Sequence, residues 1–258
     1  MQRIIWALFI ILLSATVNGQ IKRLDTEHFQ ANYEVEAEKY VLASLEVLEL
    51  ARNLAISAGY DLPDKLQFSV IRSERNVLYF DRKKLNGITW EYNSLENLLP
   101  PAESRKKNVY GLCHEIGHLC MYRITNNKNN WMSYDYRESW ADFFGNFLID
   151  SVFQYMGTDF WPEPHDYSES AGMDFFLQRI ENDNPKLQSF NKSALFWYEL
   201  NLNLGFRNIP GFFEEIKKRR VRNPDANQKF LDVLEEYIGE DDLSVWFNEY
   251  ADYLILDK

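Results

Sequence analysis

The feature that most constrains the fold of this chain is a pair of short motifs near its middle. Residues 114–118 read His-Glu-Ile-Gly-His, and residues 138–142 read Glu-Ser-Trp-Ala-Asp. In each motif the outer residues are four apart, so on a helix they lie on one face, one turn from each other. The intervening stretch, 119–137, is long enough to end one helix, turn and return antiparallel. The two motifs therefore predict a pair of neighbouring antiparallel helices.

The first motif has the residue types and spacing of a metal site. Imidazoles of His114 and His118 on one helix face can reach the same ion, and Glu115 lies beside them, where a carboxylate can take a proton from a bound water. Zinc usually has at least three protein ligands, so this hypothesis requires another one. A metzincin would place Gly at 121 and His at 124, but the chain has Met121 and Ile124, which excludes that class.

The second motif offers the missing ligand. Glu138 can complete the metal site from the second helix, and Asp142, one turn further, lies on the same helix face. A carboxylate that accepts a hydrogen bond from the other ring nitrogen of a ligand histidine fixes its tautomer. We expect Asp142 to hold His114 in this way.

These motifs and their spacing resemble those of the gluzincin metallopeptidases, whose members include the thermolysin-like proteases. The predicted order of helix, small mixed sheet, two ligand helices and helical tail is similar as well. The resemblance implies a zincin-like fold and one Zn2+ ion bound by His114, His118 and Glu138. It also implies hydrolysis of peptide bonds in a peptide or protein substrate, with Glu115 as general base and Asp142 behind the ligands.

An oxyanion formed during such a reaction needs a second hydrogen-bond donor besides the metal. The family uses a Tyr or His in this role, but no motif places that residue in this chain. His165 follows the second ligand helix in a proline-rich segment, and three tyrosines are further candidates. The candidates are His165, Tyr134, Tyr136 and Tyr198.

Two alternatives to an endopeptidase stay open. Gly87-Ile-Thr-Trp-Glu91 has a weak likeness to the G-x-M-E-N motif of gluzincin aminopeptidases, in which the Glu binds the free amine of the substrate. It has one residue too many, lacks the Met, and has Tyr92 in place of Asn. The second alternative is a zinc-stabilised binding protein without catalysis. We also expect residues 88–92 to form the edge strand along which an extended peptide could add.

Hydrophobic periodicity predicts a strand-and-helix half followed by an all-helical half. We therefore expect an α+β fold, with a catalytic part (20–155) and a helical part (156–258) that closes the cleft. Expected strands are 66–71, 77–80 and 88–92; expected helices are 33–58, 104–123, 136–153, 171–181, 192–204, 210–219, 226–238 and 241–255.

The N-terminal segment predicts export of the protein. Arg3 precedes an apolar stretch, 4–13, and the small residue Gly19 follows at a suitable distance for cleavage, as in a signal peptide spanning 1–19. We expect a secreted or periplasmic protein with no membrane span after cleavage. Cys113 and Cys120, seven residues apart on a predicted helix, would have Cα atoms about 10 Å apart, too far for a disulfide.

Net charge excludes one class of partner. The chain has 28 Lys and Arg against 39 Asp and Glu, a formal net charge of −11. Binding to a polyanion requires a basic surface that displaces counterions. We therefore expect no nucleic-acid partner, and the sequence leaves the oligomeric state undetermined.

Overall fold

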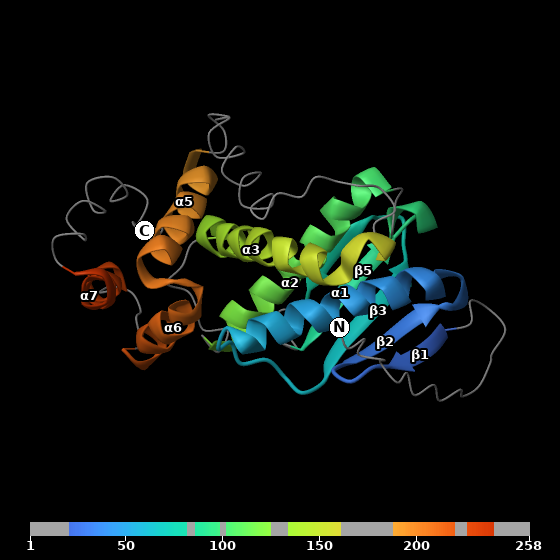
Figure 1. Ribbon diagram of the computed structural model, residues 1–258, viewed down its shortest axis with the longest axis horizontal. Helices are drawn as coiled ribbons and strands as arrows, with labels where there is room; N and C mark the ends of the chain where they lie inside the picture. Colours follow the sequence, from blue (N-terminus) through green and yellow to red (C-terminus); the bar gives the residue numbers. More distant parts are fainter. Residues whose placement is uncertain are drawn as a thin grey trace.

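The fold is mixed α+β, as a computed structural model shows (Figure 1). The structure describes residues 21–81, 86–98, 102–124, 134–160, 188–219 and 226–239. A five-stranded sheet and helices α1 to α3 occupy one side of the view, and α5, α6 and α7 occupy the other. The elements are β1 (Ile21–Asp25), β2 (Phe29–Glu34), α1 (Glu38–Ser57), β3 (Leu66–Arg72), β4 (Val77–Phe80), β5 (Gly87–Tyr92), α2 (Ala102–Ile124), α3 (Tyr134–Phe160), α5 (Gln188–Leu204), α6 (Ile209–Lys218) and α7 (Ala226–Ile238).

The sheet is mixed, with strand order β1-β2-β3-β5-β4. β2, β3 and β5 are parallel to one another, whereas β1 and β4 pair antiparallel at the two edges. The prediction that residues 88–92 form an edge strand is therefore wrong. β5 lies between β3 and β4, and its inward residues Ile88, Trp90 and Tyr92 are buried as in an inner strand. The edge position belongs to the short β4.

Two N-terminal strands were not predicted from the sequence. The structure places β1 and β2 before the first helix, so residues 33 and 34 are strand and Val35–Ala37 is a 3-10 turn, where a helix from residue 33 was expected. Phe29, Ala31 and Tyr33 are buried and alternate with polar residues. This period of two is the signal of a half-buried strand, and it was outweighed by the helical period that follows.

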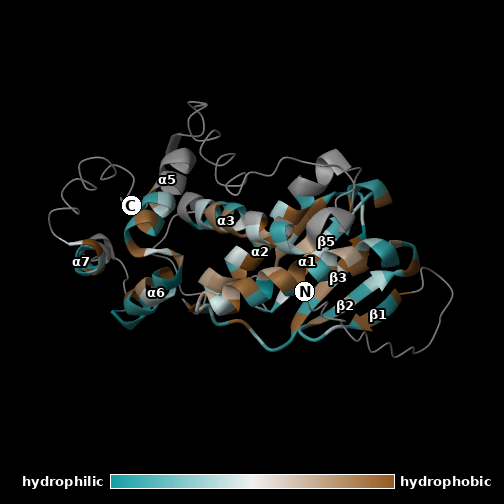
Figure 2. Ribbon diagram, in the orientation of Figure 1, coloured by the Kyte–Doolittle hydropathy of each residue, from teal (hydrophilic) through white to brown (hydrophobic). Residues whose placement is uncertain are grey.

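The helices cover one face of the sheet. Buried side chains alternate along β2 and β3, and α1 and α2 contact the strands from that side. Hydrophobic residues concentrate where these helices overlap the strands (Figure 2). This arrangement positions α2 between the sheet and α3, so that α3 contacts α2 more extensively than it contacts the other elements.

The helical part packs against α3 through aromatic side chains. Trp140 on α3 contacts Trp197 on α5 at 5.1 Å and Phe213 on α6 at 5.1 Å between ring centroids. Phe147 stacks on Phe206 at 4.0 Å. Phe147 packs against one hydrophobic core, which contains the other four residues and also residues of the sheet. α3 is therefore joined to α5 and α6 by a cluster of aromatic side chains.

The expected cysteine environment agrees with the structure. Cys113 and Cys120 are both buried on α2 and both are free. Within the described ranges, no helix combines the length and the hydrophobicity that crossing a bilayer requires. The proposed signal peptide 1–19 and the expected helices 171–181 and 241–255 lie outside the described residues.

Candidate metal centre

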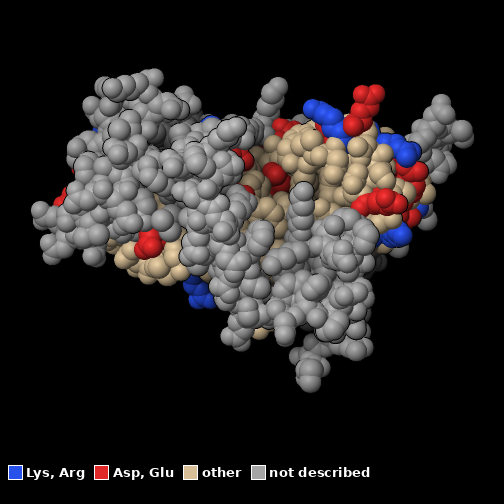
Figure 3. Space-filling model, turned by 90° about the horizontal axis from the view of Figure 1, so that it is seen from above, with Lys and Arg blue, Asp and Glu red and all other residues tan. Residues whose placement is uncertain are grey.

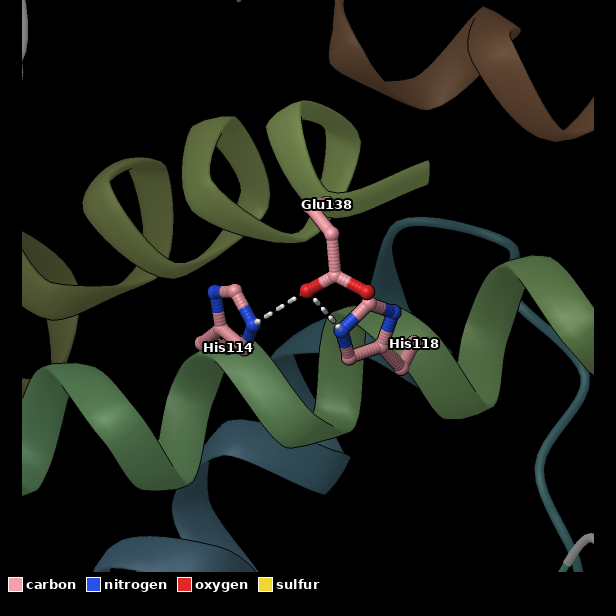
Figure 4. A group of neighbouring side chains, drawn as sticks. All are labelled: His114, His118 and Glu138. Atoms are coloured by element: carbon pink, nitrogen blue, oxygen red, sulfur yellow. Dashed lines mark hydrogen bonds and ion pairs between the residues drawn. The ribbon is translucent and has the colours of Figure 1, made fainter. Parts of the chain in front are cut away.

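Three potential metal ligands converge between α2 and α3. His114 and His118 rise from successive turns of α2, and Glu138 extends towards both from the first part of α3 (Figure 4). One ligand atom from each residue lies within 4.8 Å of the others. Among the residues that the structure describes, this is the one cluster of His, Cys, Asp and Glu with such geometry.

The distances are suitable for a tetrahedral ion. The same oxygen, Oε2 of Glu138, lies 3.2 Å from Nε2 of His118 and 3.7 Å from Nε2 of His114. Zinc bonds of about 2.0–2.2 Å in a tetrahedron place neighbouring ligand atoms about 3.4 Å apart. Two imidazoles and one carboxylate are also a donor set that catalytic zinc uses. The residues present therefore fit a single zinc ion.

Asp142 contacts the far side of the His114 ring. Its Oδ1 lies 2.9 Å from Nδ1 of His114, the ring nitrogen that faces away from Glu138. The structure thus places Asp142 against His114, as the spacing of the second motif predicted. The contact holds the Nδ1 hydrogen and leaves Nε2 to face the cluster.

Small residues let the two helices approach closely enough for these contacts. A Cβ atom on Gly145 would lie 3.1 Å from the backbone nitrogen of His114, and one on Gly117 would lie 3.0 Å from Cβ of Phe144. The Trp140 indole donates a hydrogen bond to the Gly117 carbonyl at 3.1 Å. The glycines remove a steric barrier, and the indole bond joins α3 to the turn of α2 that carries the histidines.

The electrostatics of the cluster favour a cation. Burial opposes the charged form of His114, but its contacts with Asp142 and Glu138 outweigh this and raise its pKa to about 10. Burial also opposes the charged form of Glu138, yet the hydrogen bonds from His114 and His118 hold its pKa well below the usual range. In the absence of metal, a proton on His114 therefore balances the carboxylates, and a metal ion would take over that charge.

Glu115 is positioned close to the ligands. It is buried beside His114 on α2, and its charge contributes to the raised pKa of His114. Seen from above, the described surface is hollowed near its centre, and acidic side chains lie in the hollow (Figure 3). The side chains of His114 and Glu138 retain 15% and 16% exposure, so neither is fully enclosed.

The structure assigns no oxyanion donor. Tyr198 is half-buried on α5, where it packs against the hydrophobic core. Tyr134 and Tyr136 belong to the first turn of α3, and their side chains are not among those described. His165 lies outside the described residues. The described residues therefore neither support nor exclude any of the four candidates as the oxyanion donor.

Glu91, the candidate amine-binding residue, is engaged elsewhere. Arg75 contacts both of its carboxylate oxygens at 2.9 Å, and Ser73 and Tyr79 donate further hydrogen bonds to it. A guanidinium keeps its charge throughout the physiological range. Glu91 is thus already neutralised by an internal cation, which argues against its binding the amine of a substrate.

Sequence reasoning missed Tyr110. Its hydroxyl donates a hydrogen bond to Oδ1 of Asp142 and lies 3.5 Å from Nδ1 of His114. The signal was present, because Tyr110 precedes His114 by four residues and therefore shares its helix face. No metal-site motif includes that position, so the spacing alone does not single it out.

Comparison of the chain with protein-family models, with curated proteins and with solved structures found no significant match.

Proposed function

We propose that this protein is an exported zinc-dependent metallopeptidase with a zincin-like fold. The observation that carries the proposal is the convergence of His114, His118 and Glu138 from two antiparallel helices, with Asp142 behind His114. The fold supports it, because a mixed sheet packs one face on the ligand helix and has an antiparallel strand at its edge. Export rests on the sequence of residues 1–19.

The roles of the residues follow from their positions. A zinc ion bound by the three ligands would lower the pKa of a bound water towards 7 and polarise a peptide carbonyl. Glu115, next to His114, accepts the proton of the attacking water and later transfers it to the leaving amine. Asp142 keeps His114 in the tautomer that directs Nε2 at the cluster.

An extended peptide has a suitable strand beside this site. β4 pairs with β5 on one side only, within the described sheet, and it packs along α2. The Phe80 ring at the end of β4 lies 6.5 Å from the His118 ring, nearly parallel to it. Main-chain hydrogen bonds to β4, rather than to the expected residues 88–92, would therefore bring a scissile bond close to the ligands.

The test is a Glu115→Gln variant. Glutamine keeps the size of the side chain but cannot accept the proton, so zinc content and fold should persist while hydrolysis of a mixed peptide library falls by about 10²- to 10⁴-fold. A chelator should abolish hydrolysis by the unaltered protein, and added zinc should restore it. Equal activity of Glu115→Gln and the unaltered protein would end the enzyme proposal.

A matched variant separates the alternatives. Glu91→Gln changes a carboxylate of the same size outside the cluster, and we expect it to cleave blocked and free peptides alike. Selective loss of cleavage at free amino termini would instead favour an aminopeptidase. Zinc binding without hydrolysis of any library peptide would identify a non-catalytic zinc-binding protein.

A further inference from the structure

A tyrosine outside both motifs belongs to the hydrogen-bond network behind the candidate metal ligands. We propose that Tyr110 is a positioning residue, whose hydroxyl holds Asp142 so that Asp142 can hold His114. The inference rests on the proposed zinc site, but it does not depend on peptide hydrolysis.

The network is centred on one oxygen atom. Oδ1 of Asp142 accepts a hydrogen bond from the Tyr110 hydroxyl and lies 2.9 Å from Nδ1 of His114. Tyr110 and His114 are one turn apart on α2, whereas Asp142 comes from α3. The contact therefore joins two turns of the first ligand helix to the second ligand helix.

Hydrogen counting shows why the hydroxyl matters. An ionised carboxylate can only accept, so Tyr110 and His114 must each supply a hydrogen to Asp142. The Tyr110 hydroxyl is 3.5 Å from Nδ1 of His114, and a hydrogen donated there would select the opposite tautomer. Because the hydroxyl donates to Asp142 instead, Nδ1 keeps its hydrogen, and Nε2 is the nitrogen left to bind a metal ion.

Burial makes the hydrogen bonds of the Asp142 carboxylate important for holding it in place. The Asp142 side chain is only 8% exposed, and a buried carboxylate is costly unless charge-assisted hydrogen bonds compensate for lost water. Asn146 donates to the backbone carbonyl of Asp142 rather than to its carboxylate. A second donor on the shared oxygen therefore helps to hold the carboxylate where it accepts from His114.

The ring of Tyr110 also has a packing role, which the test must separate from its hydroxyl. A Cβ on Gly145 would lie 3.2 Å from Cε2 of Tyr110, so the ring lies against α3 at Gly145. Tyr110→Phe keeps this ring and removes only the oxygen. Tyr60→Phe is the matched control, because the ring of Tyr60 packs against Trp140 and Phe144 of α3. Within the described part of the chain, its buried hydroxyl has no hydrogen-bond partner.

The experiment measures zinc affinity by competition with a chelator of known affinity, using the full chain. We expect Tyr110→Phe to raise the zinc dissociation constant by roughly 10-fold, at the lower end of effects for residues behind metal ligands. Tyr60→Phe should leave it unchanged. In an Asp142→Ala background, Tyr110→Phe should add less than about a twofold change, since the oxygen that accepts its hydrogen bond is gone. Absorption bands of the cobalt-substituted protein should shift in Tyr110→Phe and not in Tyr60→Phe.

Two results would overturn the inference: unchanged affinity in Tyr110→Phe, or an equal loss with and without Asp142. The second comparison still decides the question if Tyr110→Phe is less stable, because a general loss of stability would appear in both backgrounds. Zinc-dependent hydrolysis with unchanged affinity in Tyr110→Phe would refute the inference and leave the peptidase proposal intact. Weakened zinc binding in Tyr110→Phe, in a protein that hydrolyses no peptide, would support the inference and refute the peptidase proposal.

Discussion

Among the described residues, Glu138 and Glu49 both contact histidines from largely enclosed positions, and of these two only Glu138 belongs to the candidate metal site. Glu138 lies between two imidazoles, with one oxygen 3.2 and 3.7 Å from their Nε2 atoms. Glu49 on α1 contacts a single imidazole, with its Oε2 2.7 Å from Nδ1 of His28. Its other oxygen accepts hydrogen bonds from the Thr26 hydroxyl and the His28 backbone N–H.

The difference lies in where the donors come from. All donors to Glu49 belong to the turn between β1 and β2, so its carboxylate fastens a local turn to α1. The candidate metal ligands, Glu138 among them, come from two helices, and one ligand atom of each lies within 4.8 Å of the others. A His–Glu contact alone therefore does not indicate a metal site, whereas convergence of several donor atoms does.

The largest expected effect is on zinc binding. Glu138→Ala removes one of three ligands, so the protein should lose its zinc on dialysis against a weak chelator that leaves the unaltered protein loaded. Glu49→Ala removes a carboxylate of the same type outside the cluster and should retain one zinc per chain. Atomic emission on the dialysed proteins measures both. Equal zinc content in the two variants would erase the distinction between the two glutamates.

A smaller effect is expected from pH. The folded metal-free protein holds a proton on His114, whose pKa is raised to about 10, above the ordinary value of about 6.5. This proton stabilises the metal-free fold fully below the ordinary value, and the contribution is lost as pH rises through the raised one. Zinc must displace the proton, so zinc affinity should rise by about tenfold per pH unit between about pH 6.5 and 8.

Chelator competition at several pH values, corrected for the protonation of the chelator, measures this slope. Asp142→Asn removes a contact that raises the His114 pKa, so its slope should be shallower towards pH 8. A flat zinc affinity in the unaltered protein would contradict the assigned proton. It would mean that the Glu138 cluster holds no proton that zinc has to displace.

The smallest effect concerns the stability of the Glu49 contact. Glu49→Gln weakens several hydrogen bonds of a buried carboxylate, and it should lower the free energy of unfolding by about 1–3 kcal/mol. Glu27→Gln is the matched control, because the Glu27 side chain is 63% exposed and such substitutions usually change stability by less than about 0.5 kcal/mol. Urea denaturation of the zinc-loaded proteins compares them. Loss of zinc from Glu49→Gln would contradict the assignment of Glu49 to a local contact outside the metal site.

Much of the candidate site was predictable because its geometry is local. Spacings of four residues on a helix fix which side chains share a face, so the convergence of His114, His118 and Glu138 and the contact of Asp142 follow from two motifs. The closeness of the helices was not predictable in this way. It depends on Gly117 and Gly145, whose value appears only when the facing residue is known.

The sheet illustrates a different limit. Strands 66–71, 77–80 and 88–92 were predicted and are confirmed as β3, β4 and β5. The order of the strands in the sheet was not predicted, because strand pairing joins residues that are distant in the chain. The period of two within a strand does not indicate which strands lie next to each other. The alternation in β2 is visible in the sequence, but its last two residues were assigned to the helix predicted from the pattern that follows.

The central claim is that two imidazoles and one carboxylate bind a single zinc ion. X-ray absorption at the zinc edge, on protein loaded with one equivalent of zinc, tests it most directly. We expect scattering from two imidazoles and further light atoms at about 2.0–2.2 Å, with no sulfur. A spectrum with a sulfur ligand near about 2.3 Å, or without imidazole scattering, would contradict the account.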